Sequence, residues 1–267
     1  MAKQFAVLGS PIDHSKSPLI HKAAYELLGL DWTYSRQELE AVELQGFLET
    51  SLLAGASLTM PLKDAAYNLV HTDDTDAIAA GAINTILRTA HGWAGFNTDV
   101  FGMVKALEDV TFSKVLILGS GATARNAVLA VKRLNPDATL AVLARDAEKA
   151  RALVDFADAN GLTPNLEVQP GDLAKFQLTI STLPPNSDTS GWFEGTPRGT
   201  LLDVAYSPWP SQLARQWAEV GGNVVSGIEM LVWQAIAQIR IFTSGNVAET
   251  LDNEDQIAAI MRKAAEG

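Results

Sequence analysis

The strongest constraint on the fold is a short apolar strand that runs straight into a glycine-containing turn and then into a helix. The strand is expected at residues 115–118, and it is followed by Gly119, Ser120, Gly121, Ala122, Thr123 and Ala124. The spacing G-x-G-x-x-A between a strand and a helix is typical of a turn that binds the pyrophosphate of a dinucleotide. Gly119 permits the tight turn, and Gly121 lets the phosphates approach the backbone. The helix N-terminus then supplies N–H groups and a partial positive charge.

The alternation of strand and helix continues after this turn. Strands are expected at residues 115–118, 140–143, 178–181 and 201–204, and helices at 123–134 and 147–159. Alternating units of this kind imply a parallel sheet with helices on both faces. We therefore expect residues 101–239 to form a Rossmann-type dinucleotide-binding domain of α/β class. Residues 183–198, rich in Pro, Gly and Ser, are expected to form a surface loop.

The first hundred residues also alternate strands with helices. Strands are expected at 5–8, 33–37 and 56–58, a hairpin at 84–88 and 93–96, and helices at 18–28, 42–53, 63–69, 74–80 and 99–107. Ser17 is the expected N-cap of the first helix, and Gly29 lies just past its end. Two more helices are expected at 228–242 and 247–265. We expect residues 1–100 and 240–267 to form an α/β substrate-binding domain, with the active site in the cleft between the two domains.

Composition excludes several classes of function. The chain has 267 residues, enough for two modest domains. A net charge of −11 disfavours nucleic acid or an anionic membrane as partner. No apolar run approaches the roughly 20 residues of a membrane span, and the N-terminus lacks the features of a signal peptide, so a cytoplasmic location is expected. With no cysteine and no H-E-x-x-H pair among four histidines, neither disulfides nor a metal site are expected.

The end of the second nucleotide strand bears on cofactor choice. An NAD site usually places an acidic residue there to hold the ribose 2′-hydroxyl. Here the residues are Ala144, Arg145 and Asp146. Arg145 suits a 2′-phosphate and favours NADP, whereas Asp146 either caps the next helix or faces the ribose and favours NAD.

A second set of polar residues lies at the ends of the expected strands. Thr59 and Lys63 flank Pro61, and proline favours the first turn of a helix, so a hydroxyl and an ammonium are expected side by side at a strand-to-helix turn. Taken singly, each of these residues has a plainer interpretation. Ser15, Ser17 and Asp99 could be helix caps, and Lys63 a solvated charge.

Six motifs, in this order, resemble those of the shikimate dehydrogenase family. They are S-x-S-P-x-x-H at residues 15–21, a form of N-V-T-x-P-x-K at 57–63, G-A-x-N-T at 81–85, N-T-D-x-x-G at 97–102, D-x-x-Y-x-P at 203–208 and G-x-x-M-L-x-x-Q at 227–234. The resemblance implies a reversible, NADPH-dependent reduction of 3-dehydroshikimate to shikimate in aromatic amino-acid biosynthesis. It also implies a small-molecule substrate and a monomer or homodimer.

The resemblance implies a role for each matching residue. Lys63 and Asp99 form the catalytic pair, and Ser15 and Ser17 bind the substrate carboxylate. The residues expected to contact the ring hydroxyls of the substrate, or the carboxylate side of the site, are Thr59, Asn84, Asp99, Tyr206 and Gln234. Gly227 and Met230 are expected to line the nicotinamide. The chemistry agrees, because ketone reduction needs a proton source, which a lysine beside a carboxylate can supply. Serine hydroxyls at a helix N-terminus can bind a carboxylate without adding net charge.

Three departures from the family pattern leave alternatives open. The family often has asparagine or aspartate where Ser57 stands, and usually a second glycine at Ala122. NADP-dependent members typically end the second nucleotide strand in N-R-T, where this chain has Ala144, Arg145 and Asp146. The alternatives are an NAD-dependent quinate/shikimate dehydrogenase and, in another class, a non-catalytic sensor of shikimate-like acids.

Overall fold

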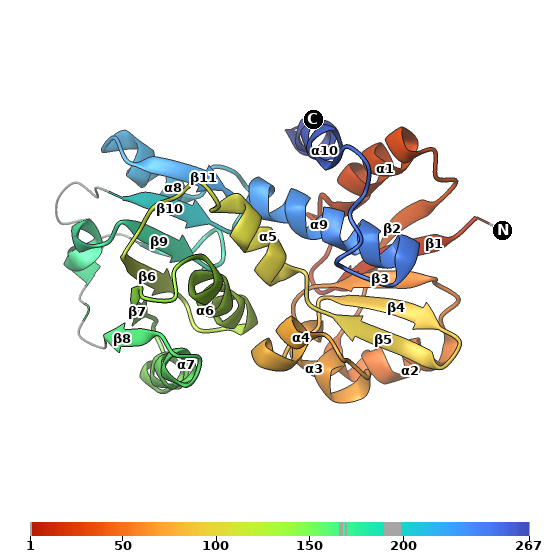
Figure 1. Cartoon of the computed structure of the whole chain (residues 1–267), viewed down its shortest axis with the longest axis horizontal. Coiled ribbons are helices and arrows are strands. Elements are labelled where there is room, and N and C mark those ends of the chain that lie inside the picture. The colour runs from red at the N-terminus through yellow and green to blue at the C-terminus, as the bar shows by residue number, and fades with distance from the viewer. Residues whose placement is uncertain (1, 166–167, 169, 190–198, 267) are drawn as a thin grey trace. The chain divides into compact units, whose positions relative to one another are not determined.

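The computed structural model describes residues 2–165, 168, 170–189 and 199–266. The chain divides into two compact units, Met1–Gly102 with Leu231–Gly267, and Met103–Met230 (Figure 1). The chain therefore returns to the first unit at Leu231 rather than near residue 240. The reason lies in helix α9 (Gly227–Ser244), where Gln234 and Gln238 hydrogen-bond to side chains of the first unit.

The first unit is built on a five-stranded mixed sheet. Its strands are β1 (Gln4–Gly9), β2 (Thr33–Glu38), β3 (Gly55–Leu58), β4 (Thr85–Thr89) and β5 (Gly92–Phe96), in the order β2-β1-β3-β4-β5. β1 runs parallel to β2 and β3, whereas β4 pairs antiparallel with β3 and β5. All but the first residue of β1 are buried, as expected for an apolar strand with neighbours on both edges. This arrangement brings the ends of β1, β2 and β3 to one edge of the sheet.

The helices of the first unit lie close to the expected positions, with two differences at their ends. They are α1 (Ser17–Leu28), α2 (Leu44–Thr50), α3 (Leu62–Leu69), α4 (Thr75–Ala80), α10 (Glu254–Glu266) and parts of α5 (Asp99–Ala106) and α9. The helix expected at 42–53 begins as a 3-10 turn and ends at Thr50. The last helix begins at Glu254 rather than at 247, because Asn253 takes a left-handed conformation with φ 57° and the Glu254 side chain accepts a hydrogen bond from the Leu251 N–H.

The second unit contains a six-stranded sheet in which all strands are parallel. The strands are β6 (Lys114–Leu118), β7 (Thr139–Leu143), β8 (Thr163–Asn165), β9 (Leu178–Ser181), β10 (Thr200–Asp203) and β11 (Asn223–Ser226), in the order β11-β10-β9-β6-β7-β8. The order reverses between β9 and β7 on either side of β6, which is the doubly wound arrangement. The expected α/β fold with a parallel nucleotide-type sheet is therefore confirmed. β8 and β11 were not expected, because β8 has three residues including a proline and β11 has only two apolar residues, both valine, between polar ones.

Helices α6 (Ala122–Leu134), α7 (Ala147–Ala159) and α8 (Gln212–Glu219) pack on this sheet. Leu116 and Leu118 of β6 pack with Leu213 and Trp217 of α8. Side chains alternate along a strand, so Val115 and Ile117 point to the opposite face, where they are also fully buried. Of the loop expected at 183–198, residues 183–189 contain neither helix nor strand, and 190–198 lie outside the described residues. No helix in the described ranges is both long and apolar enough to cross a membrane.

Candidate active site

An ion pair between Lys63 and Asp99 lies at the centre of the candidate site. Lys63 is the second residue of α3, directly after the turn that follows β3, and Asp99 is the first residue of α5. Lys63 Nζ lies 2.6 Å from Asp99 Oδ2, and the two side chains are only 15% and 6% exposed. Removing charges from water is costly, so a nearly buried pair of this kind needs further polar partners. The structure thus brings together the two residues that the motifs assigned to acid–base chemistry.

Asn84 supplies the further partner of Asp99. Its Nδ2 donates to Asp99 Oδ1 at 2.8 Å, so each carboxylate oxygen has its own donor. The orientation of the Asn84 amide is set from the other end, because Oδ1 accepts from the Thr98 N–H and the Thr85 hydroxyl, both at 2.8 Å. The Asp99 N–H donates to the side chain of Asn97 at 3.0 Å. Asp99 is therefore held in one orientation by groups that are themselves fixed.

Gln234 approaches the same cluster from α9. It is 7% exposed, and its Oε1 accepts from the Thr98 hydroxyl at 3.5 Å. Its Nε2 donates to the Leu231 carbonyl at 2.8 Å. Thr59 lies in the turn before α3, where its N–H donates to the Leu8 carbonyl at 2.9 Å and its carbonyl accepts from the Leu62 N–H at 2.8 Å. Both residues thus belong to the unit that contains the ion pair.

Ser15 and Ser17 lie on the loop that leads into α1 and are 3% and 5% exposed. The expectation that Ser17 caps α1 is wrong. Lys16 is already in a helical conformation (φ −88°, ψ −4°), and its carbonyl accepts from the N–H groups of Leu19 and Ile20, so the helix begins at Ser17 itself. The Ser17 N–H lies 3.3 Å from Ser15 Oγ. Since the hydroxyl of Ser17 is not used as a cap, its loss should not weaken the helix end.

The glycine turn of the second unit has the backbone conformation that its sequence requires. Gly119 has φ +107°, and a Cβ there would lie 2.4 Å from Thr182 Oγ1. Around Gly121, by contrast, no atom lies within 4 Å of a Cβ position, which leaves space beside the backbone. Ser120 lies between these glycines. Helix α6 begins at Ala122, so Ala122 and Thr123 form its first turn, one residue earlier than expected.

Asp146 takes the capping role that was one of its two interpretations. Its Oδ1 accepts from the N–H groups of Glu148 and Lys149 at 3.0 and 3.1 Å, which makes it the N-cap of α7. The cap uses one carboxylate oxygen, which orients the Asp146 side chain toward the first turn of α7. Arg145, at the carboxyl end of β7, is exposed and carries the local positive charge.

Tyr206, Gly227 and Met230 belong to the second unit. Tyr206 follows β10, and Gly227 is the first residue of α9. A Cβ at Gly227 would lie 2.4 Å from the Val204 carbonyl oxygen, so only glycine permits this close approach of the two segments. Met230 is 8% exposed.

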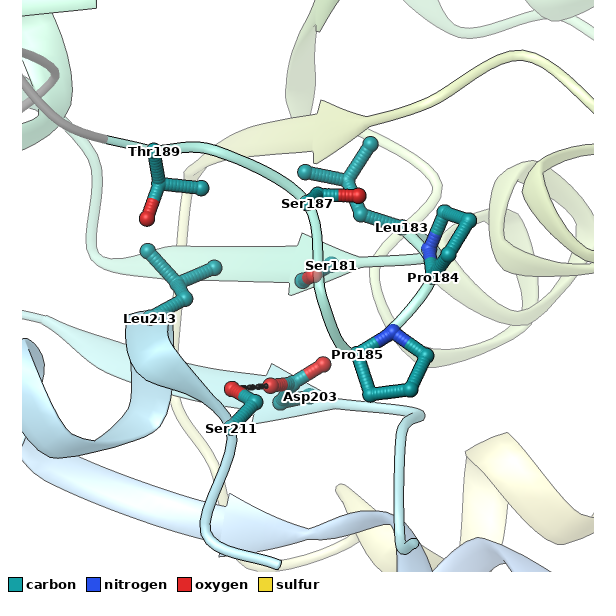
Figure 2. A pocket seen from close by; sticks show the side chains of 9 residues that line it. All are labelled: Ser181, Leu183, Pro184, Pro185, Ser187, Thr189, Asp203, Ser211 and Leu213. Carbon is teal, nitrogen blue, oxygen red and sulfur yellow. Dashed lines mark hydrogen bonds between the residues drawn. The ribbon is translucent and has the colours of Figure 1, made fainter. Parts of the chain in front are cut away.

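Asp203 is a buried carboxyl group to which the sequence assigned no role. It ends β10 beside a pocket, and Figure 2 shows its hydrogen bond to the side chain of Ser211. Burial raises the pKa of Asp203 above its usual range, and hydrogen bonds from Ser211, Ala205 and Ser181 partly offset that effect. The pocket is lined by Ser181, Leu183, Pro184, Pro185, Ser187, Thr189, Asp203, Ser211 and Leu213. Asp203 therefore fixes the segment that leads to Tyr206.

Two polar residues near the ion pair were given no role from the sequence. Gln238 lies one helical turn after Gln234 and is 1% exposed, and Ser57 donates to its Oε1 at 2.8 Å. A spacing of four residues on a helix places two glutamines on one face, and that signal could have identified Gln238.

Comparison with known sequences identifies relatives over nearly the whole chain. Residues 7–86 match the family described as "Shikimate dehydrogenase substrate binding domain". A protein of Methanococcoides burtonii named shikimate dehydrogenase (NADP(+)) is 34% identical over 94% of this chain and 100% of its own length. One of the same name from Nitrosopumilus maritimus is 32% identical over 91% of this chain and 93% of its own.

Solved structures give the same result. Shikimate dehydrogenase from Mycobacterium tuberculosis is 35% identical, with a TM-score of 0.81 over 97% of this chain and 98% of that one. The enzyme of Thermus thermophilus, solved in complex with NADP(H) and shikimate, is 26% identical, with a TM-score of 0.79 over 98% of this chain and 99% of that one.

Proposed function

This chain belongs to the shikimate dehydrogenase family, and from that premise we propose that it catalyses the reversible, NADPH-dependent reduction of 3-dehydroshikimate to shikimate. The reaction is a step of aromatic amino-acid biosynthesis. The observation that carries the proposal is the Lys63–Asp99 ion pair, at 2.6 Å and nearly buried, with Asn84 on the second carboxylate oxygen. This arrangement provides a proton donor whose orientation is fixed before substrate binds.

Lys63 has the central chemical role in the proposed mechanism. As the ketone becomes an alcohol, its oxygen gains negative charge, and Lys63 Nζ donates a proton to that oxygen. Asp99 orients the ammonium group and stabilises its charge until the proton leaves. In the reverse direction, Lys63 accepts the proton of the substrate hydroxyl. Bound NADPH supplies the hydride.

The residues of the second unit fit a dinucleotide. The left-handed conformation of Gly119 and the open space beside Gly121 form a turn that a pyrophosphate can approach, and α6 begins there. Arg145 would hold the 2′-phosphate, and Gly227 and Met230 the nicotinamide end. We therefore infer that the unit Met103–Met230 binds NADP and that the other unit binds the substrate.

Two observations favour this function over its alternatives. The capping role accounts for the presence of Asp146 beside Arg145 without a ribose contact, and the relatives at 32% and 34% identity bear NADP(+) in their names. An intact Lys63–Asp99 pair disfavours a sensor without activity. We also propose that the protein is a monomer or homodimer and that it acts in the cytoplasm.

A spectrophotometric assay at 340 nm tests the proposal. Shikimate and quinate are each combined with NADP and with NAD, and the rate of reduced-cofactor formation is measured for the four pairs. The highest kcat/KM is expected for shikimate with NADP. Absence of turnover with all four pairs would indicate a sensor, and a preference for quinate with NAD would support the alternative enzyme.

Replacing either serine of the α1 loop should weaken substrate binding. Ser15→Ala and Ser17→Ala each remove a hydroxyl proposed to donate to the shikimate carboxylate, and a hydrogen bond to a charged group is worth about 1.5 to 3 kcal/mol. KM for shikimate should rise roughly tenfold or more in each variant, with KM for NADP unchanged. Ser35→Ala, on the exposed edge strand β2, is the control. A lower melting temperature with an unchanged KM would contradict the binding role.

Replacing Arg145 should affect NADP and spare NAD. Guanidinium–phosphate pairing is bidentate and strong, and a 2′-hydroxyl cannot replace the phosphate. Arg145→Ala should raise KM for NADP roughly tenfold or more, while KM for NAD barely changes. Asp146→Asn is the companion variant. Because asparagine caps a helix about as well as aspartate, this variant should leave both thermal stability and NADP use nearly unchanged. If Arg145→Ala left KM for NADP unchanged and the wild type preferred NAD, the proposed role of Arg145 in binding NADP would be wrong.

A further inference from the structure

The carboxamide of Gln238 makes three hydrogen bonds inside the first unit. Its Oε1 accepts from the Ser57 hydroxyl at 2.8 Å. Its Nε2 donates to Gln234 Oε1 at 2.8 Å and to Thr85 Oγ1 at 3.2 Å. Both amide hydrogens are therefore engaged, and the side chain is 1% exposed. A side chain that is buried and has both donors engaged is poorly placed to contact a substrate, so we expect its influence to pass through its neighbours.

The bonds permit only one orientation of this amide. Turning it over would place Gln238 Oε1 against Gln234 Oε1, two acceptors face to face. Gln234 cannot turn to relieve this, because its own Nε2 donates to the Leu231 carbonyl at 2.8 Å, and a turned amide would set oxygen against oxygen there. The two glutamines thus hold each other in a fixed direction.

The same logic sets the direction of the bonds beyond Gln238. A serine hydroxyl has a single proton, which Ser57 gives to Gln238, so the contact of 2.5 Å between Tyr34 and Ser57 has the tyrosine as donor. On the other side, Thr85 receives from Gln238 and donates to Asn84 Oδ1 at 2.8 Å. The series then reaches the ion pair, and in order it comprises Tyr34, Ser57, Gln238, Thr85, Asn84, Asp99 and Lys63.

The orientation of the Gln234 side chain depends on Gln238 more strongly than the orientation of the Asn84 side chain does. Asn84 keeps a second anchor, the Thr98 N–H at 2.8 Å, if Gln238 is lost. Gln234 Oε1 would keep only the Thr98 hydroxyl at 3.5 Å, at the limit of a hydrogen bond. The second Nε2 hydrogen of Gln234 is then no longer directed, and among the described residues it has no acceptor.

We infer that Gln238 is a positioning residue that fixes the carboxamide of Gln234 so that its remaining N–H is presented to an oxygen of the substrate. The inference rests on the proposed function. The contact between Ser57 and Gln238 also explains why serine fits at position 57, where this chain departs from the family pattern. Where the family often carries asparagine or aspartate, this chain has a short hydroxyl, and the carboxamide of Gln238 enters from α9 to bond with it. Substrate affinity therefore depends on a residue that does not touch the substrate.

Gln238→Glu is the sharpest test, because it keeps the shape and the acceptor for Ser57 and leaves at most one proton where the amide has two donors. KM for shikimate should rise roughly five- to tenfold, the range for one neutral hydrogen bond, while kcat stays within about twofold and KM for NADP is unchanged. Gln238→Leu, which removes donors and acceptor together, should raise KM at least as much. Gln256→Glu, at an exposed site of α10, is the matched control and should match the wild type.

The outcomes separate this inference from the proposed function. A wild type that does not oxidise shikimate would remove the proposed function and the inference with it. An active wild type, together with Gln238 variants of unchanged KM, would overturn the role of Gln238 alone. A fall in melting temperature with an unchanged KM, or failure of both variants to fold, would show a purely structural residue and would also overturn it.

Discussion

Lys63→Ala should lower kcat for shikimate oxidation by about 100-fold or more, with a much smaller change in KM. An acid–base group contributes on the order of 100- to 10,000-fold to a rate, and this contribution is made in the transition state rather than in substrate binding. The ion pair supports so large an effect, because Nζ lies 2.6 Å from Asp99 with only 15% of the lysine side chain exposed. Bulk water has little access to replace the missing ammonium group.

The measurement is steady-state kinetics at 340 nm with saturating NADP, together with a melting curve. Asp99 keeps the Asn84 amide as a partner in the variant, so the fold should survive. Lys22→Ala is the matched control, since Lys22 lies on α1 with 74% of its side chain exposed and only a 3.9 Å contact to Glu26. Near-normal kcat with a raised KM would show that Lys63 only binds the substrate.

The parts of the fold that sequence predicts well are those determined by local pattern. The parallel nucleotide-type sheet follows from an apolar strand running into a glycine that must adopt φ +107°. Short elements are not predicted from the sequence. For example, β8 has three residues, one of them proline, and shows no periodic pattern. The exact ends of helices are missed for a different reason. The start of α10 depends on a left-handed Asn253 and on a hydrogen bond that the Leu251 N–H donates to the side chain of Glu254.

In the candidate site, too, local features could be predicted and long-range contacts could not. Its residue types could be predicted because each motif is contiguous in sequence. The partners that orient them could not, because the Ser57–Gln238 bond joins residues 181 positions apart. Ser17 shows the opposite error, where a local rule gave a cap that the backbone of Lys16 makes unnecessary. Sequence thus predicts the groups that take part in chemistry more readily than the hydrogen bonds that hold them.

His21 should make the protein much less stable in mild acid. Burial lowers the pKa of His21 from 6.5 to about 3, an effect only partly offset by its hydrogen bond to the Ser17 carbonyl at 3.0 Å. A carbonyl can only accept, so Nδ1 carries the proton and Nε2 would have to take up the second one. Within the described part of the chain Nε2 has no hydrogen-bond partner, and the ring stacks on Tyr34 at 3.9 Å. A charge placed there is poorly solvated.

The direction of the pH effect follows from proton binding. Between pH 3 and 6.5 the unfolded chain holds a proton on His21 and the folded chain does not, so the stability that is present above pH 6.5 is lost as the pH falls. By pH 4 the free energy of unfolding should be lower by roughly 3 kcal/mol from this group alone, at about 1.4 kcal/mol per pH unit. Urea unfolding from pH 7 to pH 4 measures it.

His21→Phe keeps the aromatic stack and cannot titrate, so its stability should decline less with acid, by about the amount that the histidine contributes. The variant also loses the bond to Ser17, which lowers its stability equally at every pH and leaves the slope as the informative quantity. His91→Asn, at the exposed turn between β4 and β5, is the control and should keep the wild-type slope. Parallel curves for wild type and His21→Phe would show that His21 takes up its proton without cost.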